Sequence, residues 1–440
     1  MGNIVNGREL VLEILLAVDR DGEYSHTALR NVLDNYQYLD KSERAFITRV
    51  TEGTLEHMIE IDYMINQFSK VKTGKMKPVI RNIIRSGVYQ LKYMDSVPAP
   101  AACNEAVKLA AKRGFAGLRG FVNGVLRSIC RNLDKISYPD RKDVKKWLSV
   151  TYSMPEWILD GWLEEYDVQT VETMLQDFLK EKPVSVRCNL SKISRRELAE
   201  RLEREGVMVS LDSELPCALY LSGFDYLGAL ESFQKGFFLV QDVSSMRVAE
   251  WAAPKEGDYV IDVCGAPGGK ALHMADKLHG TGFVEARDLT EYKTELIWDN
   301  IRRCGMSNIE ATCQNATVCD EASKEKADIL IADLPCSGLG VLGKKTDLKY
   351  KITPEAQESL VKLQRDILTV VNRYVKPGGK LIYSTCTIHR RENEENTRWF
   401  TDTFPEFEKV RERQFLPGID EGDGFYIALF QKKSQEAISG

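Results

Sequence analysis

Two cysteines stand just beyond apolar, strand-like runs, and their type and position suggest covalent chemistry. Cys336 follows the run 328–331, and Cys386 follows the run 379–382. In an open α/β sheet, ligands bind beyond the carboxyl ends of the strands, so both thiols are expected at that edge. Most cysteines are small buried packing residues, whereas an accessible thiolate is a nucleophile. The pair therefore predicts a covalent reaction, provided that the rest of the chain builds such a sheet.

A glycine-containing turn follows the expected strand 259–263 and opens a helix. Its candidate cofactor-binding residues are Cys264, Gly265, Ala266, Pro267, Gly268, Gly269 and Lys270. Glycines at such a turn let the backbone approach a ligand, with the amino end of a helix behind it. A P-loop is excluded, because only three residues separate Gly265 from Gly269 and Ala271 replaces the magnesium-binding hydroxyl. The dinucleotide fingerprint is broken as well, because Ala266 and Pro267 follow Gly265.

Two further polar residues end the next strands of this region. Asp288 follows the strand 282–287, about 20 residues after the glycine turn, where an acid can bind ribose hydroxyls. Alternatively, Asp288 could be the N-cap of a helix that begins before Glu291. The glycine turn upstream favours the ribose interpretation over this one. Asn315 directly follows the strand 309–314, and its side chain could contact an adenine edge or simply form a turn. A nucleoside without a polyphosphate fits this set, so S-adenosylmethionine is expected in preference to ATP or NAD.

Alternating strands and helices from residue 236 onward predict the sheet that these residues require. The expected strands are 259–263, 282–287, 309–314, 328–332 and 380–384. The expected helices are 270–278, 292–304, 354–375 and 391–404. This order predicts an α/β, Rossmann-like parallel sheet with right-handed crossovers. A last strand, 424–431, follows a glycine-containing turn and is expected to run antiparallel at an edge.

The rest of the chain divides by its hydrophobic period. Apolar residues recur at helical spacing before residue 183, and strand-like alternation begins there. The expected organisation is a helical bundle at 1–138, a helical linker at 139–182, a small α+β (RRM-like) module at 183–235, a catalytic domain at 236–434 and a tail at 435–440. The fold class is therefore multidomain.

Charge is distributed unevenly along the chain. The formal net charge is −5, yet residues 70–135 hold 14 Lys or Arg against 3 acidic residues. A basic segment on an acidic body predicts contact with a polyanion, and a solvated helical face is the alternative. The candidate residues for this contact are Lys70, Lys72, Lys75, Lys77, Arg81 and Arg127.

Composition excludes several other classes. The 10 cysteines and 5 histidines show no metal-ligand spacing, so we expect no metal and reduced thiols in the cytoplasm. No apolar run approaches the roughly 20 residues of a membrane span, and the N-terminus lacks a signal-peptide layout. We expect no membrane contact, and nothing in the sequence demands more than a monomer.

The loops 264–270, 333–338 and 384–386, with residues 241–245, resemble those of RNA 5-methylcytosine methyltransferases. The segment 121–127 resembles part of the NusB-like RNA-binding domain. The combination is similar to the bacterial 16S ribosomal RNA cytosine-C5 methyltransferase family, and the resemblance covers nearly the whole chain.

The resemblance implies specific roles. It implies a class I S-adenosylmethionine-dependent methyltransferase domain that acts on 16S ribosomal RNA. Cys386 would attack carbon 6 of a cytosine, Cys336 would help to release the product, and Asp333 would bind the cytosine ring. Lys270 would hold the cofactor loop or, alternatively, be a solvated lysine at a helix start.

The chain also departs from the family pattern. Gly265 and Ala271 stand where the family more often has Ala and Thr, and Asn315 replaces the usual Asp. An amide oxygen can still accept a bond from the adenine amino group.

The other function considered is a non-catalytic NusB-like RNA-binding or antitermination-type factor. The basic segment favours it. Asp333, Cys336 and Cys386 argue against it, because a binding module needs none of them.

Overall fold

The computed structural model describes residues 6–36 and 38–434. The described residues form two compact units, one within residues 6–179 and 342–352 and the other within residues 180–341 and 353–434. The predicted tail at 435–440 lies outside the described residues. Among the described residues, no helix has the length and apolar character to cross a membrane.

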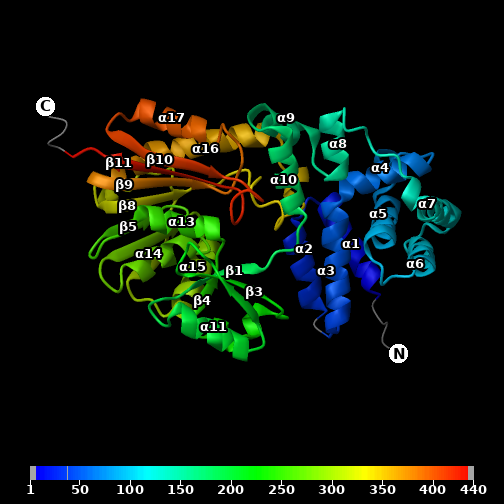
Figure 1. The fold of residues 1–440 in the computed structure, drawn as a ribbon, viewed down its shortest axis with the longest axis horizontal. Helices are drawn as coiled ribbons and strands as arrows, with labels where there is room; N and C mark the ends of the chain where they lie inside the picture. Colours follow the sequence, from blue (N-terminus) through cyan, green and yellow to red (C-terminus); the bar gives the residue numbers. More distant parts are fainter. Residues whose placement is uncertain (1–5, 37, 435–440) are drawn as a thin grey trace. The chain divides into compact units, whose positions relative to one another are not determined.

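The first unit is built from helices (Figure 1). They are α1 (Gly7–Asp19), α2 (Ser25–Asn35), α3 (Lys41–Glu56), α4 (Met58–Phe68), α5 (Pro78–Tyr93), α6 (Ala99–Lys112), α7 (Arg119–Arg131), α8 (Val144–Thr151), α9 (Glu156–Glu165) and α10 (Val168–Phe178), with single 3-10 turns η1 (Thr73–Lys75), η2 (Ala116–Leu118) and η3 (Leu133–Lys135). Local signals set their starts: Asp40 forms a capping box with Glu43 on α3, and Pro78 opens α5. Apolar stripes of the first seven helices share one core, including Ile14 and Ile83.

A segment from later in the chain completes this unit. Residues 342–352, which include η6 (Leu348–Tyr350), separate from the second unit and group with the helices. Asp347 accepts bonds from the Ser25 amide at 2.9 Å and the Ser25 hydroxyl at 2.7 Å. Lys349 Nζ donates to the Glu56 carbonyl oxygen at 2.9 Å. The chain therefore leaves the second unit shortly after Cys336 and returns to it at α16.

The second unit begins with a small antiparallel sheet in the order β2-β3-β1-β4. Its elements are β1 (Val184–Cys188), α11 (Arg195–Arg204), β2 (Met208–Leu211), β3 (Ala218–Ser222), η4 (Leu227–Ala229), α12 (Glu231–Gln234) and β4 (Phe238–Val240). The strand β4 pairs with β1 although it follows residue 235, where we placed the end of this module.

The larger sheet has seven strands in the order β10-β11-β9-β8-β5-β6-β7. Its elements are α13 (Val243–Ala252), β5 (Tyr259–Asp262), α14 (Gly269–Lys277), β6 (Phe283–Asp288), α15 (Glu291–Cys304), β7 (Ile309–Cys313), η5 (Glu321–Ser323), β8 (Ala327–Asp333), α16 (Pro354–Val371), η7 (Asn372–Tyr374), β9 (Val375–Thr385), α17 (Glu394–Thr403), β10 (Phe407–Phe415) and β11 (Phe425–Lys432). The strands β5 to β9 are mutually parallel, as expected.

Helices cover both faces of this sheet (Figure 1). Ile329 and Ile331 of β8 pack in one core with α13, α14 and α15. Leu330 and Ala332 of the same strand pack in the opposite core with α16 and α17. The alternation of side chains along a strand produces these two layers, so the expected Rossmann-like fold is confirmed.

One expectation about the sheet is wrong. The last strand, β11, is antiparallel as predicted, but it lies between β9 and β10 and not at an edge. The edge is β10, for which we expected no strand. Its middle carries Glu408, Lys409, Arg411, Glu412 and Arg413, a charged composition that hides a strand in the sequence and is typical of sheet edges.

Candidate active site

The structure brings the two predicted cysteines together at one edge of the large sheet. The strands β8 and β9 run parallel in neighbouring positions, with Asp333 opposite Ser384. Cys336 and Cys386 follow these strand ends, and their sulfur atoms lie 3.4 Å apart. Both side chains are partly exposed. Two thiols are therefore available to the same small substrate group.

A partly buried ion pair lies at the same strand ends. Lys270 Nζ is 2.7 Å from Asp333 Oδ2, and the Ser384 hydroxyl donates to Asp333 Oδ1 at 2.8 Å. Burial lowers the pKa of Lys270, but the charge and hydrogen bond of Asp333 outweigh it and the net pKa is raised. The solvated-lysine alternative is wrong, because this side chain is only 13% exposed.

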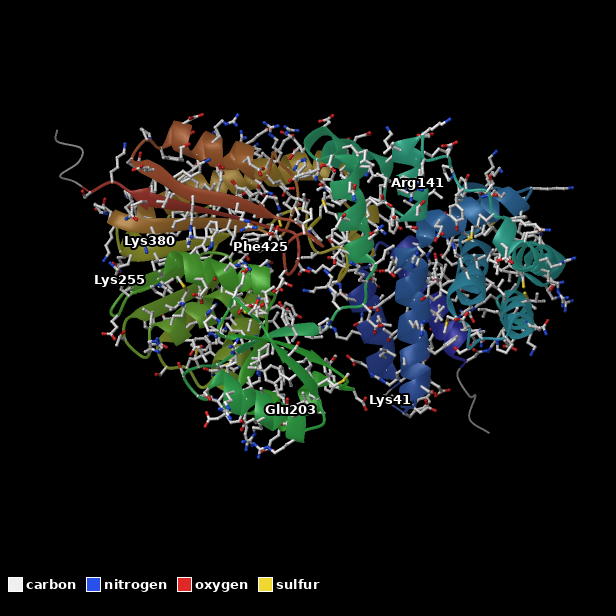
Figure 2. The ribbon with its side chains drawn as sticks, viewed as in Figure 1. Lys41, Arg141, Glu203, Lys255, Lys380 and Phe425 are labelled. Atoms are coloured by element: carbon white, nitrogen blue, oxygen red, sulfur yellow. The ribbon has the colours of Figure 1, made fainter. Side chains whose placement is uncertain are left out.

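Lys270 also lies against Phe425, the first residue of β11. Its ammonium group is 5.2 Å from the centre of the Phe425 ring. Figure 2 labels Phe425 at one end of the sheet and Lys380 of β9 at the other. Phe425 thus marks the end of the sheet at which the cysteines lie.

The glycine turn holds Asp288 in place. The Ala266 amide donates to Asp288 Oδ2 at 3.1 Å, and the Leu289 amide donates to Oδ1 at 2.7 Å. Lys293 Nζ lies 3.0 Å from the same carboxylate. The residue that caps α15 is Thr290, so the helix-cap interpretation of Asp288 is wrong.

Gly268 is required by the turn on two grounds. Its φ of 106° is in the region that L-residues rarely adopt, and an added Cβ would lie 2.6 Å from Leu272 Cδ1. Gly269 has ordinary space around it. The Cys264 thiol is partly buried, and burial raises its pKa, so this sulfur is protonated and its backbone forms the turn.

Asp262 belongs to the site, although we did not include it among the candidates. It ends β5, is 1% exposed, and its Oδ2 has no hydrogen-bond partner within the described part of the chain. Burial and the charge of Asp333 raise its pKa to about 7. Its position at the start of the glycine turn is the signal that could have identified it.

Asn315 is exposed and forms a turn of its own. Its side-chain oxygen accepts from the Thr317 amide at 3.0 Å and the Thr317 hydroxyl at 2.8 Å. These contacts are those of the turn that the sequence left as an alternative. Its contact with adenine stays a prediction.

These residues fit a nucleoside ligand without a polyphosphate. The turn 264–270 presents backbone and small side chains, and the buried Oδ2 of Asp262 can accept a bond. Asp288 is held as an acceptor beside them. Lys270, the one lysine of the turn, is engaged by Asp333 and not directed at a phosphate. The donor and acceptor set therefore fits S-adenosylmethionine.

The RNA-binding candidates lie in the first unit. Lys70, Lys72, Lys75, Lys77 and Arg127 are exposed. Arg81 instead forms an ion pair with Asp19 at 2.6 Å, and both side chains are 17% exposed. Contact of these residues with RNA stays a prediction.

One group of side chains within the described residues has metal-ligand types. Cys217, Glu250 and His273 place one donor atom each within 4.8 Å of one another. However, Lys277 already pairs with Glu250 at 2.9 Å, and burial raises the pKa of Cys217 to about 11. A protonated thiol and a neutralised carboxylate are poor metal ligands, so we assign no metal here.

Comparison with known proteins agrees with this site. The family model "16S rRNA methyltransferase RsmB/F" matches residues 249–431. The "NusB family" model matches residues 5–131, and a "Methyltr_RsmF/B-like, ferredoxin-like domain" model matches residues 154–224.

Relatives match along the whole chain. A probable ribosomal RNA small subunit methyltransferase B of Bacillus subtilis is 35% identical over 97% of this chain and 98% of its own length. The ribosomal RNA small subunit methyltransferase B of Cronobacter sakazakii is 28% identical over 98% of this chain and all (100%) of its own.

Solved structures show the same fold. The structure titled PH0851 has a TM-score of 0.82 at 24% identity and covers 97% of this chain and 99% of its own. NSun6 from Pyrococcus horikoshii with SFG has a TM-score of 0.59 at 21% identity, covering 63% of this chain and 98% of its own. The expected family is confirmed: the chain belongs to the 16S rRNA methyltransferase RsmB/F family of S-adenosylmethionine-dependent RNA methyltransferases.

Proposed function

We propose that this protein methylates carbon 5 of one cytosine in 16S ribosomal RNA, with Cys386 as the nucleophile and Cys336 assisting product release. The observation that carries the proposal is the 3.4 Å separation of the two sulfur atoms beside the Lys270–Asp333 pair. Two adjacent carbon atoms of one base are within reach of two such thiols. Because the substrate is ribosomal RNA, we also propose a cytoplasmic location.

The reaction requires a thiol because carbon 5 of cytosine is a poor nucleophile. The Cys386 thiolate adds to carbon 6, and the electron pair of the 5,6 double bond becomes available at carbon 5. Bound S-adenosylmethionine would supply an electrophilic methyl group to carbon 5 and leave as S-adenosylhomocysteine. A base then removes the carbon 5 proton, which restores the double bond and expels Cys386 as a thiolate. Cys336, adjacent to Cys386, assists this last step.

Asp333 and its neighbours hold the base while charge develops on the ring. The Asp333 carboxylate is oriented by Lys270 on one oxygen and Ser384 on the other. An ionised carboxylate accepts hydrogen bonds, so Asp333 would hold the base through the amino group of cytosine and fix its orientation toward Cys386. The target base must leave its stack to reach this edge, because neighbouring bases would otherwise block both faces of the ring.

Two cysteine variants test the proposal. Cys386→Ala should abolish 5-methylcytosine in 16S ribosomal RNA, measured by mass after nuclease digestion. Cys336→Ala should accumulate a covalent protein–RNA adduct on a denaturing gel. The control is Cys313→Ala, an exposed cysteine on β7 whose loss should change neither result. Methylation at the normal rate by Cys386→Ala would sink the assignment, and an adduct that survives the removal of Cys386 would reverse the two roles.

The basic segment favours a second function, that of a non-catalytic RNA-binding factor. Calorimetry with S-adenosylmethionine separates the two. Binding at a 1:1 ratio supports the enzyme, whereas absence of binding by folded protein supports the factor.

A further inference from the structure

A buried carboxylate links the two cysteine loops. Glu392 lies just before α17 and is 0% exposed. Its Oε2 accepts from the Ser337 amide at 2.9 Å and from Gln364 Nε2 at 3.0 Å. Its Oε1 accepts from the Ser337 hydroxyl. His389 Nδ1 lies 3.3 Å from that oxygen. Glu392 therefore binds the residue that directly follows Cys336.

The same network reaches the loop of the other cysteine. The Ser337 and Thr387 hydroxyl oxygens are 2.7 Å apart, and Thr387 directly follows Cys386. The Gly340 amide donates to the Cys386 carbonyl oxygen at 3.0 Å. Gln364 also donates to the Pro335 carbonyl oxygen at 2.9 Å. The residues that follow both cysteines are thus bonded to each other, and one buried carboxylate anchors them.

The charged neighbours of the two thiols differ in sign. The hydrogen bond to Cys386 and burial raise the pKa of Cys336 well above its usual value, and the charges of Glu392 and Asp333 act in the same direction. Tyr383 also interacts electrostatically with Cys336. Lys270, by contrast, is a cation that interacts with Cys386. Negative charge thus surrounds one sulfur, while a cation lies near the other.

The bonds around Glu392 use both of its oxygens as acceptors. Burial of a charge is costly unless it is compensated, and here donors from Ser337 and Gln364 compensate it on both oxygens, whereas an amide offers only one acceptor oxygen. Neutral amides fill the surrounding positions, as in the bond from Asn396 Nδ2 to Gln364 Oε1 at 2.7 Å. Replacement of Glu392 by an amide therefore removes both a charge and an acceptor from this network.

We propose that Glu392 is a positioning residue of the methyl-transfer reaction, whose carboxylate fixes the geometry between the two cysteine loops. Its negative charge also favours the neutral thiol of Cys336 over the thiolate. This inference rests on the proposed function and adds the reason why the two thiols take unequal roles. Glu392 acts through Ser337 and Thr387 and does not itself touch the substrate.

The first test measures the chemistry of the thiol without RNA. Cys336 is titrated by its alkylation rate with iodoacetamide as a function of pH, with peptide mass spectrometry to separate the cysteines. The titration is made in a Cys386→Ala background, which removes the strongest neighbour of Cys336. Glu392→Gln in that background should lower the midpoint of Cys336 alkylation by about 1 pH unit, because a like charge is removed. An unchanged midpoint would overturn the electrostatic part of the proposal.

The second test separates attack from release. With Cys386 present, Glu392→Gln should lower kcat for 16S ribosomal RNA about tenfold and leave KM unchanged, because the loops lose alignment and not RNA contacts. RNA that carries 5-fluorocytosine accumulates the adduct, since fluorine cannot leave as a proton does. Glu392→Gln should form this adduct at the wild-type rate, because the release step and not the attack depends on Glu392. Slower formation of the adduct would overturn this assignment to release. A wild-type kcat would overturn the positioning role.

Two further variants make these results specific. Glu412→Gln on β10 removes a partly buried carboxylate bonded to Tyr426 and Thr397, and it should change neither readout. Ser337→Ala keeps the charge but removes the bridge to Thr387, so it should lower kcat without shifting the alkylation midpoint. Ser337→Ala also tests the linkage if Glu392→Gln does not fold, and a wild-type kcat for it would overturn the linkage. The alkylation test uses no RNA, so it can fail or succeed independently of the proposed methylation.

Discussion

Two enclosed lysines, one in each unit, show opposite electrostatic outcomes. Lys270 at the sheet edge pairs with Asp333, and its pKa is raised despite burial. Lys349 in the helical unit is 4% exposed, and its ammonium donates to a backbone carbonyl of Glu56. Burial lowers the pKa of Lys349 to about 7, and the charge of Glu56 only partly opposes this. A close carboxylate, and not the depth of burial, decides whether a buried lysine stays charged.

The same substitution should therefore have opposite effects at the two sites. Lys270→Met leaves the Asp333 carboxylate without its cation, so methyl transfer should fall at least about 100-fold and stability by about 3 kcal/mol. Methyl incorporation and the thermal midpoint measure these changes. The matched control on the same helix is Lys277→Met: its pair with Glu250 is 30% exposed on both sides, against 13% for Lys270 and 27% for Asp333, so its loss should matter less. Equal effects of the two variants would contradict the role of the buried pair.

Lys349→Met should stabilise the helical unit, by on the order of 3 kcal/mol near neutral pH. The folded-state pKa of Lys349, about 7, lies below its ordinary value of 10.5. Between these values the unfolded chain binds more protons, so wild-type stability rises as pH rises from about 7 toward 10.5. Below pH 7 the full cost of the charged form is present. Thermal midpoints from pH 6 to 10 should show this slope in the wild type and lose it in Lys349→Met.

Glu60 is a buried but paired charge in the same helical unit as Lys349, so it tests whether pairing also keeps a carboxylate charged there. Burial would raise its pKa, but His57, Lys92 and Tyr138 outweigh it and lower the pKa to about 2. The resulting stability is present above the ordinary value of 4.5 and is lost as pH falls toward 2. Glu60→Gln should remove this acid dependence and cost about 2 kcal/mol at neutral pH. Denaturant unfolding at pH 3 and pH 7 gives the comparison, and a slope that survives in the variant would assign it to other groups.

An exposed pair should give the smallest effect. Glu358 on α16 and Arg391 lie 2.5 Å apart, but the two side chains are 56% and 53% exposed. Glu358→Gln should change stability by less than about 0.5 kcal/mol, because water screens the pair and competes for it. A larger change in the denaturation midpoint would show that the short distance between the two charged groups, and not their exclusion from water, decides how much such a pair stabilises the fold.

Much of the catalytic unit is readable from local patterns, and its exceptions have local causes. The strands β5 to β8 follow from short apolar runs next to turns, which are local signals. The charged edge strand β10 gives no such signal. Because we did not predict β10, we expected β11 to form the edge of the sheet. The predicted antiparallel direction of β11 was right.

The site shows a similar division. Asp288 had two local interpretations, and the cap by Thr290 excludes one of them. Asp262 was overlooked because an acid at a strand end says nothing by itself about an unpaired, buried oxygen. The placement of residues 342–352 with the helices was equally invisible, since the bonds from Ser25 to Asp347 join residues 322 positions apart.

The sequence by itself determined that a glycine turn, an acid and two thiols follow the ends of separate strands, because strand periodicity and turn chemistry are encoded within a few residues. Only the tertiary structure decided which charges meet. Lys270 finds Asp333 across 63 positions, and Glu392 joins the Cys336 loop across 55. Pairing of buried charges depends on distance in space and on exclusion of water, and neither is a property of a local stretch of chain.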